Sequence, residues 1–170
     1  MLRKYHKIVI LVTQKMASRN NKKVIILMPD PVEWIFMSYV TDRGRIVTED
    51  WDTHQSFEAE TALDTFIESN RKTKDYMQWP EWKHKMHGSP GKEGVVEFGF
   101  KATGKQYRVL CIFKGKMCVV ILCMAFHKQN VWDPPGTEKT VTDRAKEVKN
   151  STAKLKLIEK EKDEESKDQK

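Results

Sequence analysis

Apolar and polar positions alternate most regularly between Gly94 and Lys128, where short glycine-containing segments break the pattern twice. The two breaks, Ala102–Lys105 and Lys114–Lys116, separate runs rich in β-branched and aromatic residues, which is typical of β-hairpins. The pattern therefore predicts three consecutive antiparallel strands, at about residues 95–101, 106–113 and 117–126.

A two-residue turn at Thr103-Gly104 would set the register of the first hairpin. Phe100 would then face Tyr107, Gly99 would face Arg108 and Lys101 would face Gln106. Alternation gives the sheet one apolar face, suited to covering helices, made of Val96, Phe98, Phe100, Tyr107, Val109, Cys111 and Phe113. The second face mixes Leu110 and Ile112 with Glu97, Gly99, Lys101 and Arg108. Such a sheet can fold against helices on one side and hold an anion on the other.

Upstream of the sheet, the pattern predicts one strand and two helices. Residues 32–40 have the composition of a strand, and Arg45–His54 indicates a short helix. Ser56 is a suitable N-cap for a second helix that extends to about Arg71. The apolar positions of this helix fall on one face and are Ala59, Ala62, Leu63, Phe66 and Ile67. We interpret its opposite face as solvated rather than catalytic; it carries Glu58, Glu60, Asp64 and Glu68. We expect the two helices to form an antiparallel hairpin on the apolar side of the sheet.

Residues 72–90 are expected to form a connecting loop anchored by Trp79 and Trp82. After the breaker Pro134-Pro135-Gly136, a C-terminal helix is predicted to follow Thr137, with apolar positions at Val141, Ala145, Val148 and Leu155. The chain thus divides into a basic extension at 1–29, one α/β domain at 30–150, and a charged tail at 151–170 that is partly helical or disordered. The extension is either a flexible arm or the product of a start site upstream of a native Met28.

The net charge of +7 is distributed unevenly along the chain. Residues 1–29 hold seven basic side chains and no acidic one, so the remainder is neutral as a whole. Residues 42–68 hold eight acids and two bases, whereas residues 71–128 hold twelve bases and four acids. Because clustered positive charge is what meets phosphate groups, this segregation is more informative than the net charge.

Neither a membrane segment nor a metal site is expected. The apolar run Ile8–Val12 is too short for a signal peptide or a membrane span. The cysteines Cys111, Cys118 and Cys123 lie in predicted strands and lack the spacing of metal ligands, so we interpret them as reduced core thiols of a cytoplasmic protein.

Four segments in order resemble the RelE/ParE superfamily of toxins, and most closely its HigB-like, phage-derived branch. Gly94–Lys101 resembles that branch's GLxELRFK strand, Tyr107–Leu110 its YRxL strand, Ala125–Lys128 the end of its last strand, and Val40–Arg45 its YVxxRGR segment. The resemblance spans about residues 32–148. It implies a small RelE-like fold, with a twisted, mainly antiparallel sheet, an N-terminal helix hairpin on one face and a short C-terminal helix.

The resemblance also implies the toxin of a type II toxin–antitoxin module. Such toxins are mRNA interferases, metal-independent and ribosome-dependent endoribonucleases in which the RNA 2′-hydroxyl attacks the adjacent phosphate. In this chain Arg108 would clamp the phosphate, Lys101 and Lys128 would add positive charge, and His127 would be the general acid or base. Further phosphate contacts would come from Lys83, His84, Lys85, His87, Lys105 and Lys116. The loop residues among these are equally consistent with an ordinary surface loop.

The last strand departs from the family pattern, because His127-Lys128-Gln129 stands where the family often has two lysines. Strand residues alternate, so His127 and Lys128 cannot both point to one face if the strand continues through them. The partners implied are a cognate antitoxin of helix-turn-helix type and mRNA on the ribosome, without a cofactor.

Two alternatives remain open. One is a ParE-like protein that inhibits DNA gyrase by contact and cuts nothing; retained toxicity without RNA cleavage would favour it. The other is an inert toxin-fold protein that only binds an antitoxin or nucleic acid. Burial of Arg108 against Glu97 as a structural ion pair would favour this second alternative.

Overall fold

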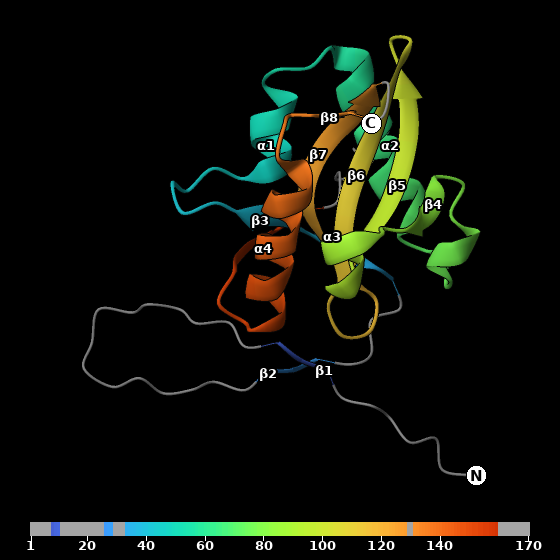
Figure 1. Ribbon diagram of the computed structural model, residues 1–170. Helices are drawn as coiled ribbons and strands as arrows, with labels where there is room; N and C mark the ends of the chain where they lie inside the picture. Colours follow the sequence, from blue (N-terminus) through green and yellow to red (C-terminus); the bar gives the residue numbers. More distant parts are fainter. Residues whose placement is uncertain (1–7, 11–25, 29–32, 129–130, 160–170) are drawn as a thin grey trace, which may run out of the picture.

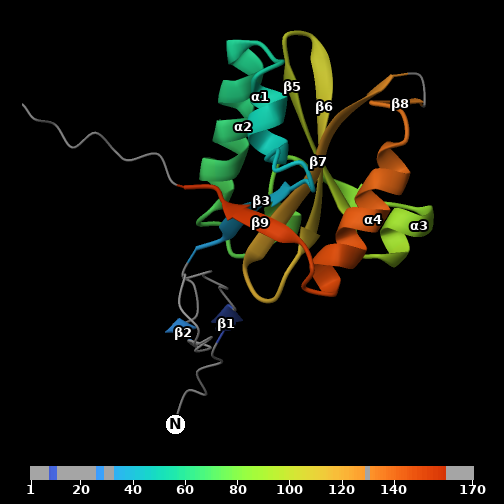
Figure 2. The ribbon, with the colours of Figure 1, turned by 90° about the vertical axis from the view of Figure 1, so that its left-hand side faces the viewer.

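The computed structural model describes residues 8–10, 26–28, 33–128 and 131–159 (Figure 1). In the first two ranges, and at residues 127 and 128, it describes the backbone alone. In these ranges the protein is a mixed α/β structure with a seven-stranded sheet. Helices cover both faces of the sheet (Figures 1 and 2). The helices are α1 (Val47–Asp52), α2 (Phe57–Asn70), α3 (Gly88–Lys92) and α4 (Thr137–Lys149), with a 3₁₀ turn at Tyr76–Gln78.

The sheet has the strand order β4-β5-β6-β7-β3-β9, and β8 pairs with the end of β7. The strands are β3 (Ile35–Val40), β4 (Trp82–Lys85), β5 (Val96–Ala102), β6 (Lys105–Phe113), β7 (Cys118–Lys128), β8 (Val131–Asp133) and β9 (Lys154–Leu157). All pairings in it are antiparallel except that of β3 with β7. A separate two-stranded sheet joins β1 (Ile8–Ile10) and β2 (Ile26–Met28). The rest of the predicted extension at 1–29, and the predicted tail beyond Glu159, lie outside the described residues.

The first hairpin has the predicted register. Phe100 pairs with Tyr107, Gly99 with Arg108, and Lys101 with Gln106. Thr103 and Gly104 at the turn have φ values of 49° and 73°, the positive angles that a type I′ turn needs at both central positions. The strand alternation that separates an apolar face from a mixed one is therefore confirmed.

The two upstream helices pack on the apolar face, as predicted. The rings of Phe66 on α2 and Phe98 on β5 are 5.4 Å apart, and Trp51 on α1 meets Tyr107 on β6 edge-on at 5.4 Å. The buried face of α2 includes Leu63 and Phe66, whereas Ser56 at its N-terminus makes no side-chain capping hydrogen bond. The buried core lies on both faces of the sheet, because Val141, Ala145 and Val148 of α4 belong to it together with the residues under α1 and α2. On the opposite face α4 covers part of β7 and is joined there by α3 (Figure 2).

Two predictions about the edges of the sheet were incomplete. The segment at 72–90 is anchored by the buried Trp79 as expected, but Trp82–Lys85 within it forms strand β4 beside β5, and Gly88–Lys92 forms α3. The C-terminal helix ends at Lys149, and Leu155 lies in β9 instead, where it pairs with Tyr39 of β3. Ser151, with φ of 57°, turns the chain back toward the sheet. Both differences arise because short edge strands depend on a neighbour that the local sequence does not reveal.

Cys111, Cys118 and Cys123 are free and buried, as predicted for core thiols. Burial raises the pKa of each thiol, and that of Cys118 to about 11. In the described ranges, none of the helices combines the length and the apolar character needed to cross a membrane.

Candidate functional site

Arg108 lies on the side of the sheet that faces away from α1 and α2, but its guanidinium is not free. Its Nε atom is 2.7 Å from Oε1 of Glu97, and the exposed fractions of the two side chains are 14% and 8%. The contact is an ion pair without hydrogen-bond geometry at Nε, while Nη1 donates to the carbonyl of Tyr107 at 3.3 Å. The charge of Arg108 is therefore largely matched by Glu97.

Gly99 provides the space that this arrangement needs. A Cβ atom at this position would lie 2.7 Å from Nη1 of Arg108 and 3.0 Å from Cε of Lys83. The missing side chain thus allows Arg108 from β6 and Lys83 from β4 to pass over the middle of β5. Two cationic side chains from the strands on either side of β5 converge above the glycine.

Two imidazoles complete the cluster. Nε2 of His84 is 3.7 Å from Oε2 of Glu97, so this carboxylate lies between Arg108 and His84. The rings of His84 and His87 stack with centroids 5.7 Å apart, and half of the His84 side chain is exposed. Both histidines are brought here by β4, because His84 pairs with Glu97 across a bulge at the start of that strand. We call Lys83, His84, His87, Glu97 and Arg108 the sheet cluster.

The other predicted site residues are spread along the sheet. Lys101 is exposed near the end of β5 and falls on the Arg108 side by alternation. Lys105 lies at the β5–β6 turn, with its ammonium 5.9 Å from the ring of Phe126. Lys116 lies in the turn at the opposite end of β6, between β6 and β7. Lys85 is exposed beside His84 and alternates to the other side of β4.

The backbone of β7 continues through both His127 and Lys128 to pair with β8. Residues 127 and 128 are described by their backbone alone, so the predicted roles of the His127 and Lys128 side chains lie outside what the structure describes.

The sheet cluster can bind an oxyanion and move a proton. Lys83 and the exposed imidazoles present donors to solvent, while the buried Glu97 can orient the ring of His84. Sequence reasoning placed Glu97 on this face and considered it as an ion-pair partner of Arg108, but gave it no part in catalysis; the ion pair is present. Arg108 lies directly opposite Gly99 on the paired strand. Glu97 is two residues from Gly99 along β5, so it is a diagonal neighbour of Arg108, and this relation is the sequence signal for their contact. In the described part of the chain, no three His, Cys, Asp or Glu side chains are arranged so that they could hold a metal ion.

Comparison of the chain with models of protein families, with curated proteins and with solved structures finds no match. The fold and the geometry of the sheet cluster are therefore the features that indicate a function.

Proposed function

We propose that this protein is an endoribonuclease of the RelE/ParE toxin type, which cleaves mRNA without a metal ion. The order of elements supports this proposal, since β3, the α1–α2 pair, the antiparallel β5–β6–β7 unit and α4 follow one another as that superfamily's pattern requires. The sheet is larger than this pattern, because β4, β8 and β9 are added to it. The proposed partners are mRNA on the ribosome and an antitoxin of helix-turn-helix type in the cytoplasm.

The observation that carries the proposal is the exposed imidazole of His84 beside the buried carboxylate of Glu97, with two cations next to it. His84 takes the proton of the attacking RNA 2′-hydroxyl. As the bond from O2′ to phosphorus forms, the bond from phosphorus to O5′ breaks, leaving a 2′,3′-cyclic phosphate. The stacked His87 gives a proton to the leaving O5′. His127, the general acid or base that the family resemblance implies, is the alternative donor.

Lys83 and Arg108 act on the charge that develops on the phosphate oxygens in this step. Their convergence above Gly99 places both cations where one phosphate would meet them. Glu97 holds Arg108 in place before the substrate arrives, because a buried carboxylate is stabilised by a paired cation. In this proposal the guanidinium of Arg108 stabilises the phosphate charge from a position that the ion pair with Glu97 fixes, and it is not freely exposed.

The test is RNA cleavage by the His84→Gln variant, with His54→Gln as the matched control. His54 is also an exposed histidine, but it follows α1, the short helix that packs on the other face of the sheet. Loss of a general acid or base is expected to slow cleavage about 100- to 10,000-fold, and the control should cleave like the parent. Primer extension on cellular mRNA after a brief induction pulse measures this directly. Equal cleavage by the parent and the His84→Gln variant would contradict the assignment.

A second candidate function is favoured by the burial of the Arg108–Glu97 pair. A protein of the same fold that only binds an antitoxin or nucleic acid would use this pair to hold β5 and β6 together. In that case Arg108→Ala would lower the stability of the fold, and neither the parent nor any variant would cleave RNA. The two candidates are therefore separated by the activity of the parent protein itself.

A further inference from the structure

The α1–α2 layer, on the face of the sheet opposite the sheet cluster, is strongly acidic. Residues 47–70 contain seven carboxylates and no lysine or arginine. Most of their side chains are at least partly exposed on the outside of the two helices. These carboxylates have no role in the proposed reaction. Their charge is opposite in sign to that of residues 71–128, which hold twelve bases and four acids.

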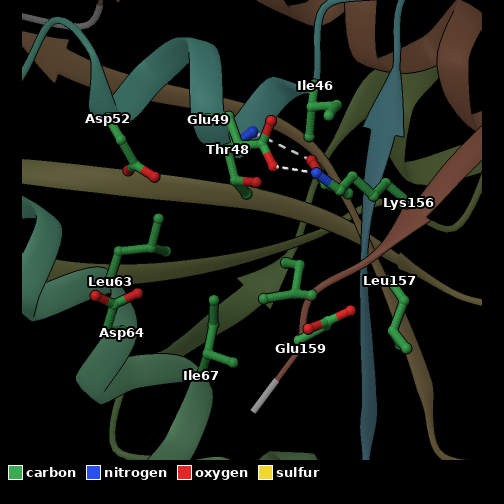
Figure 3. A pocket seen from close by; sticks show the side chains of 12 residues that line it. Ile46, Thr48, Glu49, Asp52, Leu63, Asp64, Ile67, Lys156, Leu157 and Glu159 are labelled. Carbon is green, nitrogen blue, oxygen red and sulfur yellow. Dashed lines mark hydrogen bonds and ion pairs between the residues drawn. The ribbon is translucent and has the colours of Figure 1, made fainter. Parts of the chain in front are cut away.

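A groove of about 380 Å³ opens in this layer between α1, α2, β3 and the end of β9 (Figure 3). Its apolar lining includes Leu63 and Ile67 of α2 and Ile158 after β9. Its polar lining contains four carboxylates, those of Glu49, Asp52, Asp64 and Glu159, beside Ser38, Thr48 and Lys156. Lys156 is the lone cation among the described residues that line the groove, and it pairs with Glu49 at 2.5 Å.

Asp52 is the carboxylate in this groove with the least compensation. Its Oδ1 atom is buried and has no hydrogen-bond partner in the described part of the chain. Burial first, and then the neighbouring Asp64, Glu60 and Glu49, raise the pKa of Asp52 to about 6. A buried polar atom without a partner costs free energy, and an approaching cation would remove that cost.

We propose that this groove docks a segment of a partner protein in which lysine or arginine alternates with apolar residues. The apolar lining takes the apolar side chains, and the carboxylates take the cations, with Asp52 as the principal acceptor. The volume of the groove matches a binding pocket for a few side chains. The complementarity of charge selects a basic partner over a neutral or acidic one.

Two neighbouring features fit an extended partner segment. Strand β9 ends the sheet, so its outer edge has no strand beside it in the described ranges and can accept one. On the other side of α2, a second hollow of about 430 Å³ is lined by Phe57, Glu58 and Glu81, and Phe57 is 78% exposed. The docking surface is separate from the sheet cluster and does not depend on the proposed ribonuclease activity.

The proposal is tested by fluorescence anisotropy of the full chain with a labelled peptide of alternating lysine and leucine. A matched peptide with glutamine in place of lysine controls for apolar adhesion. The lysine peptide should bind and the glutamine peptide should not. Binding of both peptides equally, or of neither, would overturn the assignment of a basic partner.

The site on the protein is tested with paired substitutions that remove the same charge. Asp52→Asn with Asp64→Asn should weaken binding of the lysine peptide about tenfold or more. Asp42→Asn with Asp50→Asn, on the same side but outside the groove lining, should weaken it less than about threefold. Equal weakening by both pairs would show a general attraction rather than docking in the groove.

Weaker binding in a variant could also result from misfolding, so a substitution that is expected to strengthen binding serves as a second test. Lys156→Gln frees Glu49 and should tighten binding of the lysine peptide about threefold, within the range of one exposed ion pair. Lys154→Gln removes the same charge from the same strand outside the groove lining and should leave binding unchanged. Loss of binding in Lys156→Gln would contradict the proposal.

Two further outcomes would assign the groove to a different occupant and so overturn the choice of a partner protein. If replacing the seven basic residues of 1–29 with glutamine strengthens peptide binding, this chain's own segment fills the groove. If the full chain self-associates in sedimentation, and Asp52→Asn with Asp64→Asn abolishes the association, the occupant is a second copy.

Discussion

The substitution Arg108→Ala separates two roles of the sheet cluster. Sequence alternation alone predicts that this change leaves the fold intact, since the residue is assigned to the open face. The structure gives a different expectation, because Arg108 is 14% exposed and holds the carboxylate of Glu97, which is 8% exposed. Removing the guanidinium leaves that carboxylate beside the imidazole of His84, whose Nε2 atom is 3.7 Å from Oε2 of Glu97.

Removing one partner of a buried ion pair costs about 3–5 kcal/mol, because the other charge is left uncompensated. Arg108 keeps some contact with solvent, so we expect a loss of about 3 kcal/mol, at the lower end of this range. For a chain of this size such a loss corresponds to a fall in Tm of about 6–12 °C. Urea unfolding at pH 7 measures the change in the free energy of unfolding.

A double-mutant cycle identifies the cause of the loss. Glu97→Gln together with Arg108→Met removes both charges and keeps most of the packing volume, so the double variant should be more stable than the single variant Arg108→Met, in which Glu97 keeps an uncompensated charge. If Arg108→Ala unfolds at the same urea concentration as the parent, the guanidinium is solvated and the ion pair contributes nothing. That result would refute the structural role of the pair and leave Arg108 available to phosphate.

Two other predictions concern single residues. Asp52→Asn should stabilise the protein at pH 7 by about 1 kcal/mol after allowance for solvent screening. The pKa of Asp52 in the folded protein is raised from 3.8 to about 6, so its ionisation opposes folding. The gain should therefore be complete above about pH 6 and disappear below about pH 4, and urea unfolding at a series of pH values checks this. Gly99→Ala should displace Arg108 and Lys83 and weaken binding of an RNA oligonucleotide. It should also destabilise the protein, by up to about 3 kcal/mol where the displacement separates Arg108 from Glu97, because Nη1 of Arg108 and the backbone carbonyl of Tyr107 both lie close to the added Cβ. Unchanged RNA binding in Gly99→Ala would show that the convergence of the two cations is unimportant.

The sequence by itself determined the parts of the fold that depend on neighbours along the chain. Thr103-Gly104 specifies a tight turn, and the turn fixes the register of every pair from Val96 with Cys111 to Ala102 with Lys105. The spacing of apolar residues determined α2 and the face that it buries. These features are local, so pattern and turn chemistry suffice to predict them.

Only the tertiary structure decided the edges of the sheet. Strands β4 and β9 have four residues each, and neither has a hairpin turn that would specify its partner. Leu155 fits the spacing of the preceding helix as well as it fits a strand. It becomes part of a strand because β3 offers backbone hydrogen-bonding groups along its edge, where Leu155 pairs with Tyr39. The pairing of β4 with β5 likewise brings His84 and His87 to the candidate site.

The tertiary structure also decided what Arg108 does. Alternation gives the face on which a strand residue lies, but not which charge on the neighbouring strand reaches it. Glu97 is diagonal to Arg108 across the hairpin, and the space above Gly99 lets the two side chains meet. Whether the guanidinium is free for a phosphate or held by a carboxylate depends on this contact, and the contact exists only when the strands are side by side.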